Sequence, residues 1–372
     1  MAYTTIDDPS AHFQTAIWTG DGSTSDRNIT NDGNSNLQPD WIWGACRSNV
    51  QHKHITDSSR GFSAGNKELI SNQTNLEGDT SAVNTGAYGW LGPSLTDGFE
   101  SSYGSTNNGY WNVNARTYVA WQWKANGGTT SSNSDGNITT TIQTNSTAGF
   151  TIGTYTGTGG DKTIGHGLGA IPDLVIIKGR DGNGQGGAAQ YWVIGAPNIL
   201  GNGTSNHVFL DTTNALMSNT TVWRNTNFTS TTIPLGGHAA INGNTAAYVF
   251  YAFKEIQGYS KIGDYYGNGI TDGTFIHCGF KPAFFLVKNL TSAAGWRLFD
   301  NKRIGFNNDN YGIAINETDV EDTSTTYCDI LSTGVKMRGT SSTVNQASNR
   351  YLYIAFAENP FVSSSGVPNT AR

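Results

Sequence analysis

An internal repeat constrains the fold of this chain more than any other feature, because three sequence anchors recur three times in the same order. The first anchor is an aromatic residue followed seven or eight positions later by Gly-x-Gly. This pattern is typical of a strand that runs into a tight turn. It occurs at Phe13 with Gly20 and Gly22, at Phe150 with Gly157 and Gly159, and at Tyr259 with Gly267 and Gly269.

The second anchor is a proline followed by an apolar run, and it occurs at Pro39, Pro172 and Pro282. Proline has no N–H to donate to a sheet, so it is expected at the entry of a strand. The apolar run behind it predicts a strand that is buried on both faces. These runs cover residues 41–43, 174–178 and 284–288.

The third anchor is an alternating aromatic segment near the end of each copy, at residues 118–124, 248–254 and 351–357. Side chains alternate between the two faces of a strand, so each segment is predicted to present one apolar stripe of three residues to a core. The stripes are Val119/Trp121/Trp123, Val249/Tyr251/Phe253 and Leu352/Ile354/Phe356.

The anchors divide the chain into three copies of one unit. Copy one is predicted to span residues 1–126, copy two residues 148–256, and copy three residues 257–372 with a C-terminal tail. Residues 127–147 contain few apolar side chains and are predicted to be a linker or a long edge excursion. The predicted fold is all-β: tandem antiparallel β-sandwiches of jelly-roll-like character with long loops rich in Gly, Asn and Thr.

Composition agrees with strands rather than helices. Charged residues make up only 13% of the chain, and 47 of 372 residues are glycine. Helices usually carry Glu, Lys and Arg on their surface, so this deficit disfavours them. Aromatic residues reach 11%, which is enough to build buried cores.

Several partner classes are disfavoured by the sequence. The net charge is −6 and no basic patch is present, so no nucleic-acid partner is expected. No apolar run approaches the ~18 residues of a membrane span, and the N-terminal segment does not resemble a signal peptide. Three cysteines without a CxxC motif are expected to be reduced thiols in or near a core: Cys46, Cys278 and Cys328.

Family resemblance rests mainly on copy three. It contains the segments GYSKIG (258–263), GFKP (279–282), WRLFD (296–300) and YIAFAENPF (353–361), with related segments in the other copies. The chain resembles a domain of unknown function found in virion structural and tail-fibre-like proteins of marine bacteriophages, including those of cyanobacteria. The resemblance covers nearly the whole chain and implies a place on the phage particle, without implying a chemistry.

The pairs Asp57-x-x-Arg60 and Asp300-x-x-Arg303 are the first candidate site, because they occur at matching places in copies one and three. They would form either a binding site for a glycan or partner subunit, or an ion pair that holds the end of a strand. The pairs follow the repeat rather than a single cleft, so we favour the ion pair. Copy two has Val193-Ile194-Gly195-Ala196 at this place and lacks the motif.

His52-x-His54 is a weak metal-binding candidate. It supplies only two ligands, so a metal would need further ligands, such as those from other chains on a threefold axis. Motifs of a serine nucleophile, a phosphate loop or a zinc protease are absent from the sequence, and no cofactor is expected.

These observations predict a non-enzymatic structural protein on the exterior of a virion, either a tail fibre or spike component or a capsid decoration protein. Its expected partners are other virion proteins and further copies of itself, as a trimer or a symmetric array. The alternative is a carbohydrate-binding module that recognises glycans on the host surface. A polysaccharide depolymerase is the third hypothesis, since paired carboxylates can lie far apart in sequence.

Overall fold

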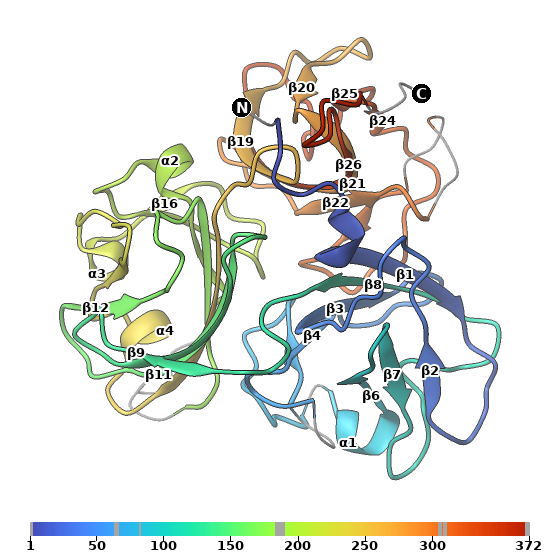
Figure 1. The fold of residues 1–372 in the computed structure, drawn as a ribbon, viewed down its shortest axis with the longest axis horizontal. Helices are drawn as coiled ribbons and strands as arrows, with labels where there is room; N and C mark the ends of the chain where they lie inside the picture. Colours follow the sequence, from blue (N-terminus) through green and yellow to red (C-terminus); the bar gives the residue numbers. More distant parts are fainter. Residues whose placement is uncertain are drawn as a thin grey trace.

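The computed structural model describes residues 3–62, 67–81, 83–182, 190–303, 307 and 311–368. The strands pair in an antiparallel manner and the helices are single short turns, so the all-β prediction is confirmed. Three lobes, one for each copy, surround a common centre (Figure 1).

Each copy contributes a main sheet and a small sheet. Copy one contains η1 (Pro9–Ala11), β1 (Phe13–Thr19), β2 (Arg27–Ile29), β3 (Trp41–Cys46), β4 (His54–Asp57), β5 (Leu69–Ile70), α1 (Thr85–Tyr88), β6 (Trp90–Ser94), β7 (Phe99–Ser102) and β8 (Thr117–Trp123). Copy two contains β11 (Phe150–Thr156), β12 (Lys162–Gly165), β13 (Leu174–Gly179), β14 (Val193–Gly195), α2 (Pro197–Leu200), β15 (Asn206–Phe209), β16 (Met217–Ser218), α3 (Thr220–Trp223), β17 (Thr232–Leu235), α4 (Ala239–Asn242) and β18 (Ala247–Phe253). Copy three contains β19 (Ser260–Tyr266), β20 (Phe275–His277), β21 (Phe280–Asn289), β22 (Arg297–Asp300), β23 (Ile313–Ala314), β24 (Cys328–Leu331), β25 (Gly334–Met337) and β26 (Arg350–Pro360).

The order of strands in the main sheet is the same in all three copies. The last strand of the copy lies between the first strand and the strand of the proline anchor, giving β1-β8-β3-β4-β5, β11-β18-β13-β14-β15-β16 and β19-β26-β21-β22-β23. The small sheets are β2-β7-β6, β12-β17 and β20-β25-β24. Residues 127–147 add β9 (Ser131–Asn133) and β10 (Thr140–Asn145) to copy two, where β10 pairs with β11.

The first and third anchors hold each other in place through an asparagine. The main-chain N–H between the two turn glycines bonds to the side-chain oxygen of Asn112, Asn242 or Asn345, in copies one to three respectively. The carbonyl of the same asparagine accepts the N–H of the second glycine. That glycine has a φ near +70° in every copy, a conformation that favours glycine over other residues. This shared turn explains why the two anchors recur together.

The outer face of each main sheet packs against the small sheet of its own copy and forms a separate apolar cluster. The inner faces behave differently, because they meet in one continuous core that contains all nine residues of the three predicted stripes. Aromatic rings link every pair of copies there: Trp41 with Tyr251, Phe13 with Phe356, and Phe253 with Phe356. The copies are therefore sandwiches that share one core. A copy on its own would expose its stripe to water.

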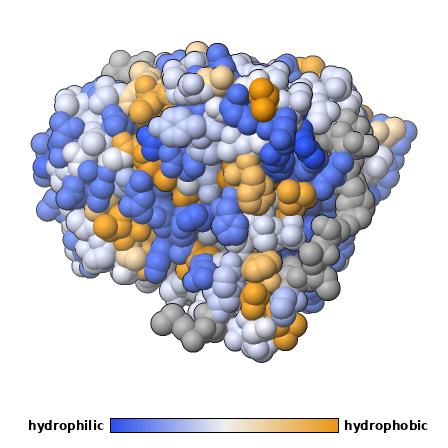
Figure 2. Space-filling view, turned by 90° about the horizontal axis from the view of Figure 1, so that it is seen from above, coloured by the Kyte–Doolittle hydropathy of each residue, from blue (hydrophilic) through white to orange (hydrophobic). Residues whose placement is uncertain are grey.

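The surface offers a contrast to this core. Figure 2 shows one face of the molecule, on which apolar residues lie in small groups between hydrophilic ones. Most of the tryptophan side chains are instead fully buried, including Trp43, Trp121 and Trp296. Burial of such side chains stabilises the fold by roughly 1.5–3 kcal/mol each.

Candidate functional site: buried polar contacts between the copies

The structure places Asp57 at the end of β4 and Arg60 in the turn that follows, with both side chains inaccessible to solvent. Arg60 Nε donates to Asp57 Oδ2 over 2.5 Å, and the Arg60 main-chain N–H donates to Asp57 Oδ1 over 2.9 Å. The aspartate thus caps the turn and neutralises the guanidinium at once. Charge-assisted bonds of this kind are strong, and a buried arginine needs them.

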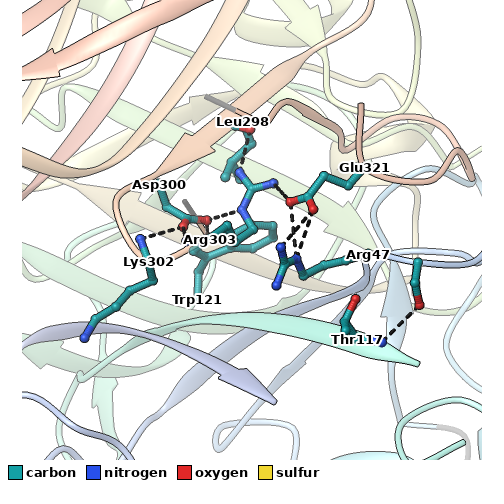
Figure 3. Close-up of polar contacts among 9 residues, drawn as sticks. Arg47, Thr117, Trp121, Leu298, Asp300, Lys302, Arg303 and Glu321 are labelled. Carbon is teal, nitrogen blue, oxygen red and sulfur yellow. Dashed lines mark hydrogen bonds and ion pairs between the residues drawn. The ribbon is translucent and has the colours of Figure 1, made fainter. Parts of the chain in front are cut away.

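Asp300 and Arg303 repeat this geometry at the end of β22. Arg303 Nε donates to Asp300 Oδ2 over 2.6 Å, and its main-chain N–H donates to Asp300 Oδ1 over 3.0 Å. Arg303 also forms an ion pair of 2.7 Å with Glu321, which in turn binds Arg47 of copy one at 2.9 Å (Figure 3). A buried charge network therefore crosses from copy three to copy one.

Each of these aspartates also accepts a hydrogen bond from another copy. Trp121 Nε1 on β8 donates to Asp300 Oδ2 over 2.9 Å, and the Tyr251 hydroxyl on β18 donates to Asp57 Oδ2 over 2.7 Å. Copy one thus donates a hydrogen bond to copy three, and copy two donates one to copy one. The donors occupy the same register position of their strands, opposite Thr15 and Ile152 on the neighbouring first strands.

The equivalent positions in copies two and three hold apolar residues. The register of β13 with β14 puts Ala196 at the position of the aspartates, and the register of β19 with β26 puts Ile354 at the position of the donors. Both residues belong to the central core. Loss of the acceptor in copy two is thus matched by loss of the donor in copy three.

Three buried lysines form a second set of contacts with the same cyclic order. Lys178 donates to the carbonyl of Gln190 in its own copy and to that of Gln73 in copy one. Lys288 donates to Ala294 in its own copy over 2.6 Å and to Thr212 in copy two over 3.4 Å.

Lys53 completes the set, with bonds of 2.9 Å to Gln51 and to Asp319 of copy three. In copies two and three the ammonium lies over a tryptophan, Trp192 or Trp296. Lys53 itself occupies the position of these tryptophans, directly before β4, so one side chain of copy one replaces a lysine and tryptophan of the others.

Burial changes the ionisation of these groups. It lowers the pKa of Lys53 to about 8 and that of Lys288 to about 7, although nearby carboxylates oppose the change. Burial also lowers the pKa of Lys178 and raises the pKa of Asp211 beside it. The charged form of each lysine is therefore costly, and main-chain carbonyls of two copies offset the cost.

The two histidines of the HxH motif have different partners. His54 Nδ1 lies 2.6 Å from Glu68 Oε2, and both side chains are buried. His52 Nδ1 lies 2.9 Å from the side-chain amide of Asn72. Across the described ranges, no group of three or more His, Cys, Asp or Glu residues is arranged to hold a metal ion. The three cysteines are buried, and the structure shows them as thiols rather than disulfides.

Family comparison covers residues 8–360, which match the model of a domain of unknown function, DUF7483. The chain belongs to the DUF7483 family. Comparisons with curated proteins and with solved structures found no match.

Within the described part of the DUF7483 chain, no helix is both long and apolar enough to cross a membrane. The aspartates and arginines singled out from the sequence lie between the copies and contact one another and the neighbouring copy. Sequence reasoning did not single out the lysines. Lys178 and Lys288 end two equivalent apolar runs. A charge repeated at the end of a buried strand was the sequence feature that could have identified them.

Proposed function

We propose that this DUF7483 chain is a non-enzymatic structural protein on the exterior of a bacteriophage particle. It would act there as a tail fibre or spike component or as a decoration protein of the capsid. The phage context rests on the sequence resemblance described above. The structural observation that supports the proposal is the closed cycle of three copies around one core.

A building block that meets mechanical load needs parts that do not separate. The central core, the Asp57 and Asp300 contacts and the three lysine contacts tie each copy to both others. The repeated aspartates and lysines, which are residue types that can form a catalytic centre, thus hold the copies together. This use of charge favours a scaffold over an enzyme.

Quantitative mass spectrometry of purified particles tests the proposal, with the major capsid protein as the reference. A fixed ratio near one per capsid subunit, or a simple fraction of it, is expected for a decoration protein. A few copies or a few tens, in multiples of three or six, are expected for a tail appendage. A replication enzyme of the same phage is the matched control and should be absent.

Absence of the protein from purified particles would overturn the proposal. A monomeric protein that turns over a small molecule or shortens a polysaccharide would also do so. A reducing-sugar assay on host envelope polysaccharide addresses the last outcome directly.

A further inference from the structure

Copy two carries a cavity of about 660 Å³ beside the β15–β16 hairpin. Its lining includes Tyr191, His207, Phe209, Asn219 and His238. This volume lies within the roughly 300–1,000 Å³ of ligand sites in proteins. The cavity borders the contacts between the copies at Thr212, whose carbonyl accepts from Lys288, and contains none of the paired Asp, Glu, Arg and Lys side chains.

The lining is uncharged at neutral pH. Among the described residues that form it there is no Asp, Glu, Lys or Arg. Burial lowers the pKa of His207 and of His238, so both imidazoles are neutral at pH 7. A charged ligand would lose its hydration without gaining a counter-charge here, so the cavity favours a neutral one.

An aromatic platform forms one wall. The ring of Tyr191 stacks on the ring of Phe209, with centroids 4.5 Å apart and planes 22° from parallel. His207 packs edge-on against Phe209 at 5.1 Å. Phe209 is buried beneath, whereas Tyr191 is half-buried, so the exposed part of the platform belongs to the tyrosine.

Hydroxyl and amide side chains surround this platform. Together with Met217 and His238, the rest of the lining consists of side chains that offer both donors and acceptors: Thr212, Asn214, Ser218, Asn219 and Thr220. A ring with an apolar C–H face and several hydroxyl groups matches an aromatic wall with a polar rim. Saccharides have this combination of groups.

The platform is not required by the repeat. The registers of β14 with β15, β4 with β5, and β22 with β23 place Phe209 where copy one has Ile70 and copy three has Ala314. Tyr191, two residues before β14, corresponds to His52 and Gly295 in the same way. Copies one and three reach the same fold without this aromatic pair, so its presence in copy two points to a ligand.

We propose that this cavity binds a neutral saccharide, with the sugar ring against Tyr191 and its hydroxyl groups on the amides and hydroxyls of the rim. Only the biological role of such binding, contact with the host surface, rests on the particle location proposed above. Binding itself is a property of the purified protein, so the two proposals can fail separately.

The test is a printed array of neutral and acidic glycans, followed by titration calorimetry at pH 7.5 with the neutral oligosaccharide that gives the strongest signal. We expect Tyr191→Ala to weaken binding at least tenfold and Tyr191→Phe to keep it within about threefold. Tyr191→Leu conserves most of the side-chain volume and should also lose binding. It takes the place of Tyr191→Ala if that variant folds poorly. Tyr266→Ala, on the exposed surface of copy three, is the matched control and should bind normally.

Binding of no neutral glycan on the array would overturn the proposal. Binding restricted to acidic glycans would overturn it as well. Unchanged affinity in folded Tyr191→Leu would show that the saccharide binds elsewhere, which also contradicts the assignment.

Discussion

Copies one and two have side chains of opposite chemistry at equivalent positions of the main sheet. Asp57 of copy one is buried, paired with Arg60, and accepts the hydroxyl of Tyr251. Ala196 of copy two stands at the same position, and the side chain equivalent to Tyr251 is Ile354. The polar arrangement requires three matched groups: the aspartate, the arginine and the donor from the neighbouring copy. The apolar arrangement requires none. An interface of this kind therefore changes by whole sets of residues, because one isolated change leaves a buried group without a partner.

Removal of one carboxylate from the polar arrangement should cause the largest loss of stability. Asp300→Ala would leave the Arg303 guanidinium with only Glu321 as a charge partner, and Trp121 Nε1 without an acceptor. Loss of one member of a buried pair costs about 3–5 kcal/mol. We expect a decrease of this size in the free energy of unfolding, measured by urea titration.

Asp264→Ala is the matched control for this variant. Asp264 pairs with Arg350 at 2.6 Å, but about a third of each side chain is exposed, 31% and 32% respectively. Exposed pairs contribute under about 1 kcal/mol. Equal losses in the two variants would contradict the role assigned to burial.

The lysine contacts predict that stability rises with pH. The folded-state pKa of Lys288 is about 7, below its ordinary value of 10.5, so between these values the unfolded chain binds more protons. The free energy of unfolding should then increase between pH 7 and pH 9, by about 2 kcal/mol for a lysine shifted this far. Lys53, with a pKa of about 8, should add a smaller rise in the same direction.

Chemical denaturation at pH 7, 8 and 9 measures this slope. Lys288→Met should reduce it, whereas Lys261→Met, which removes an ammonium on a side chain that is 40% exposed, should leave it unchanged. Cysteines with a raised pKa, such as Cys278 at about 12, act in the opposite direction as the pH approaches and passes the ordinary thiol value of about 9, whereas Asp211 does so mainly below pH 7. A stability that falls steadily from pH 7 to pH 9 would refute the assignment.

The sequence was sufficient for the parts of the fold that depend on local pattern. Alternation along β8, β18 and β26 identified the apolar stripes, because a period of two fixes which side chains share a face. It could not identify what covers that face, so the single shared core was not predicted. The ion pair of Asp57 with Arg60 was favoured because the motif follows the repeat, but its third member, Tyr251, lies 194 residues away.

Features without a counterpart in the other copies were the hardest to predict. Tyr191 and Phe209 are separated by 18 positions, and neither belongs to an anchor. Only the pairing of β14 with β15 brings them together. A comparison between copies finds such a site after the register is known, because the repeat then shows which residues the fold does not need.

Tyr251→Phe and Ile354→Val should have the smallest effects, and together they sharpen the comparison most. The substitution removes one hydroxyl from a buried contact and leaves Asp57 bonded to Arg60, so we expect a loss of about 1.5 kcal/mol. Ile354→Val at the equivalent apolar position should cost about 0.5–1.5 kcal/mol through a small cavity.

The two losses differ in kind, and a double-mutant cycle separates them. Tyr251→Phe combined with Asp57→Asn should show a coupling energy of at least about 0.5 kcal/mol, because the two groups share a bond. Tyr251→Phe combined with Ile354→Val should be additive within about 0.5 kcal/mol if the two contacts act independently. Additivity in the first pair would mean that the hydroxyl contributes by packing alone. The polar and apolar contacts would then be equivalent in energy as well as in position.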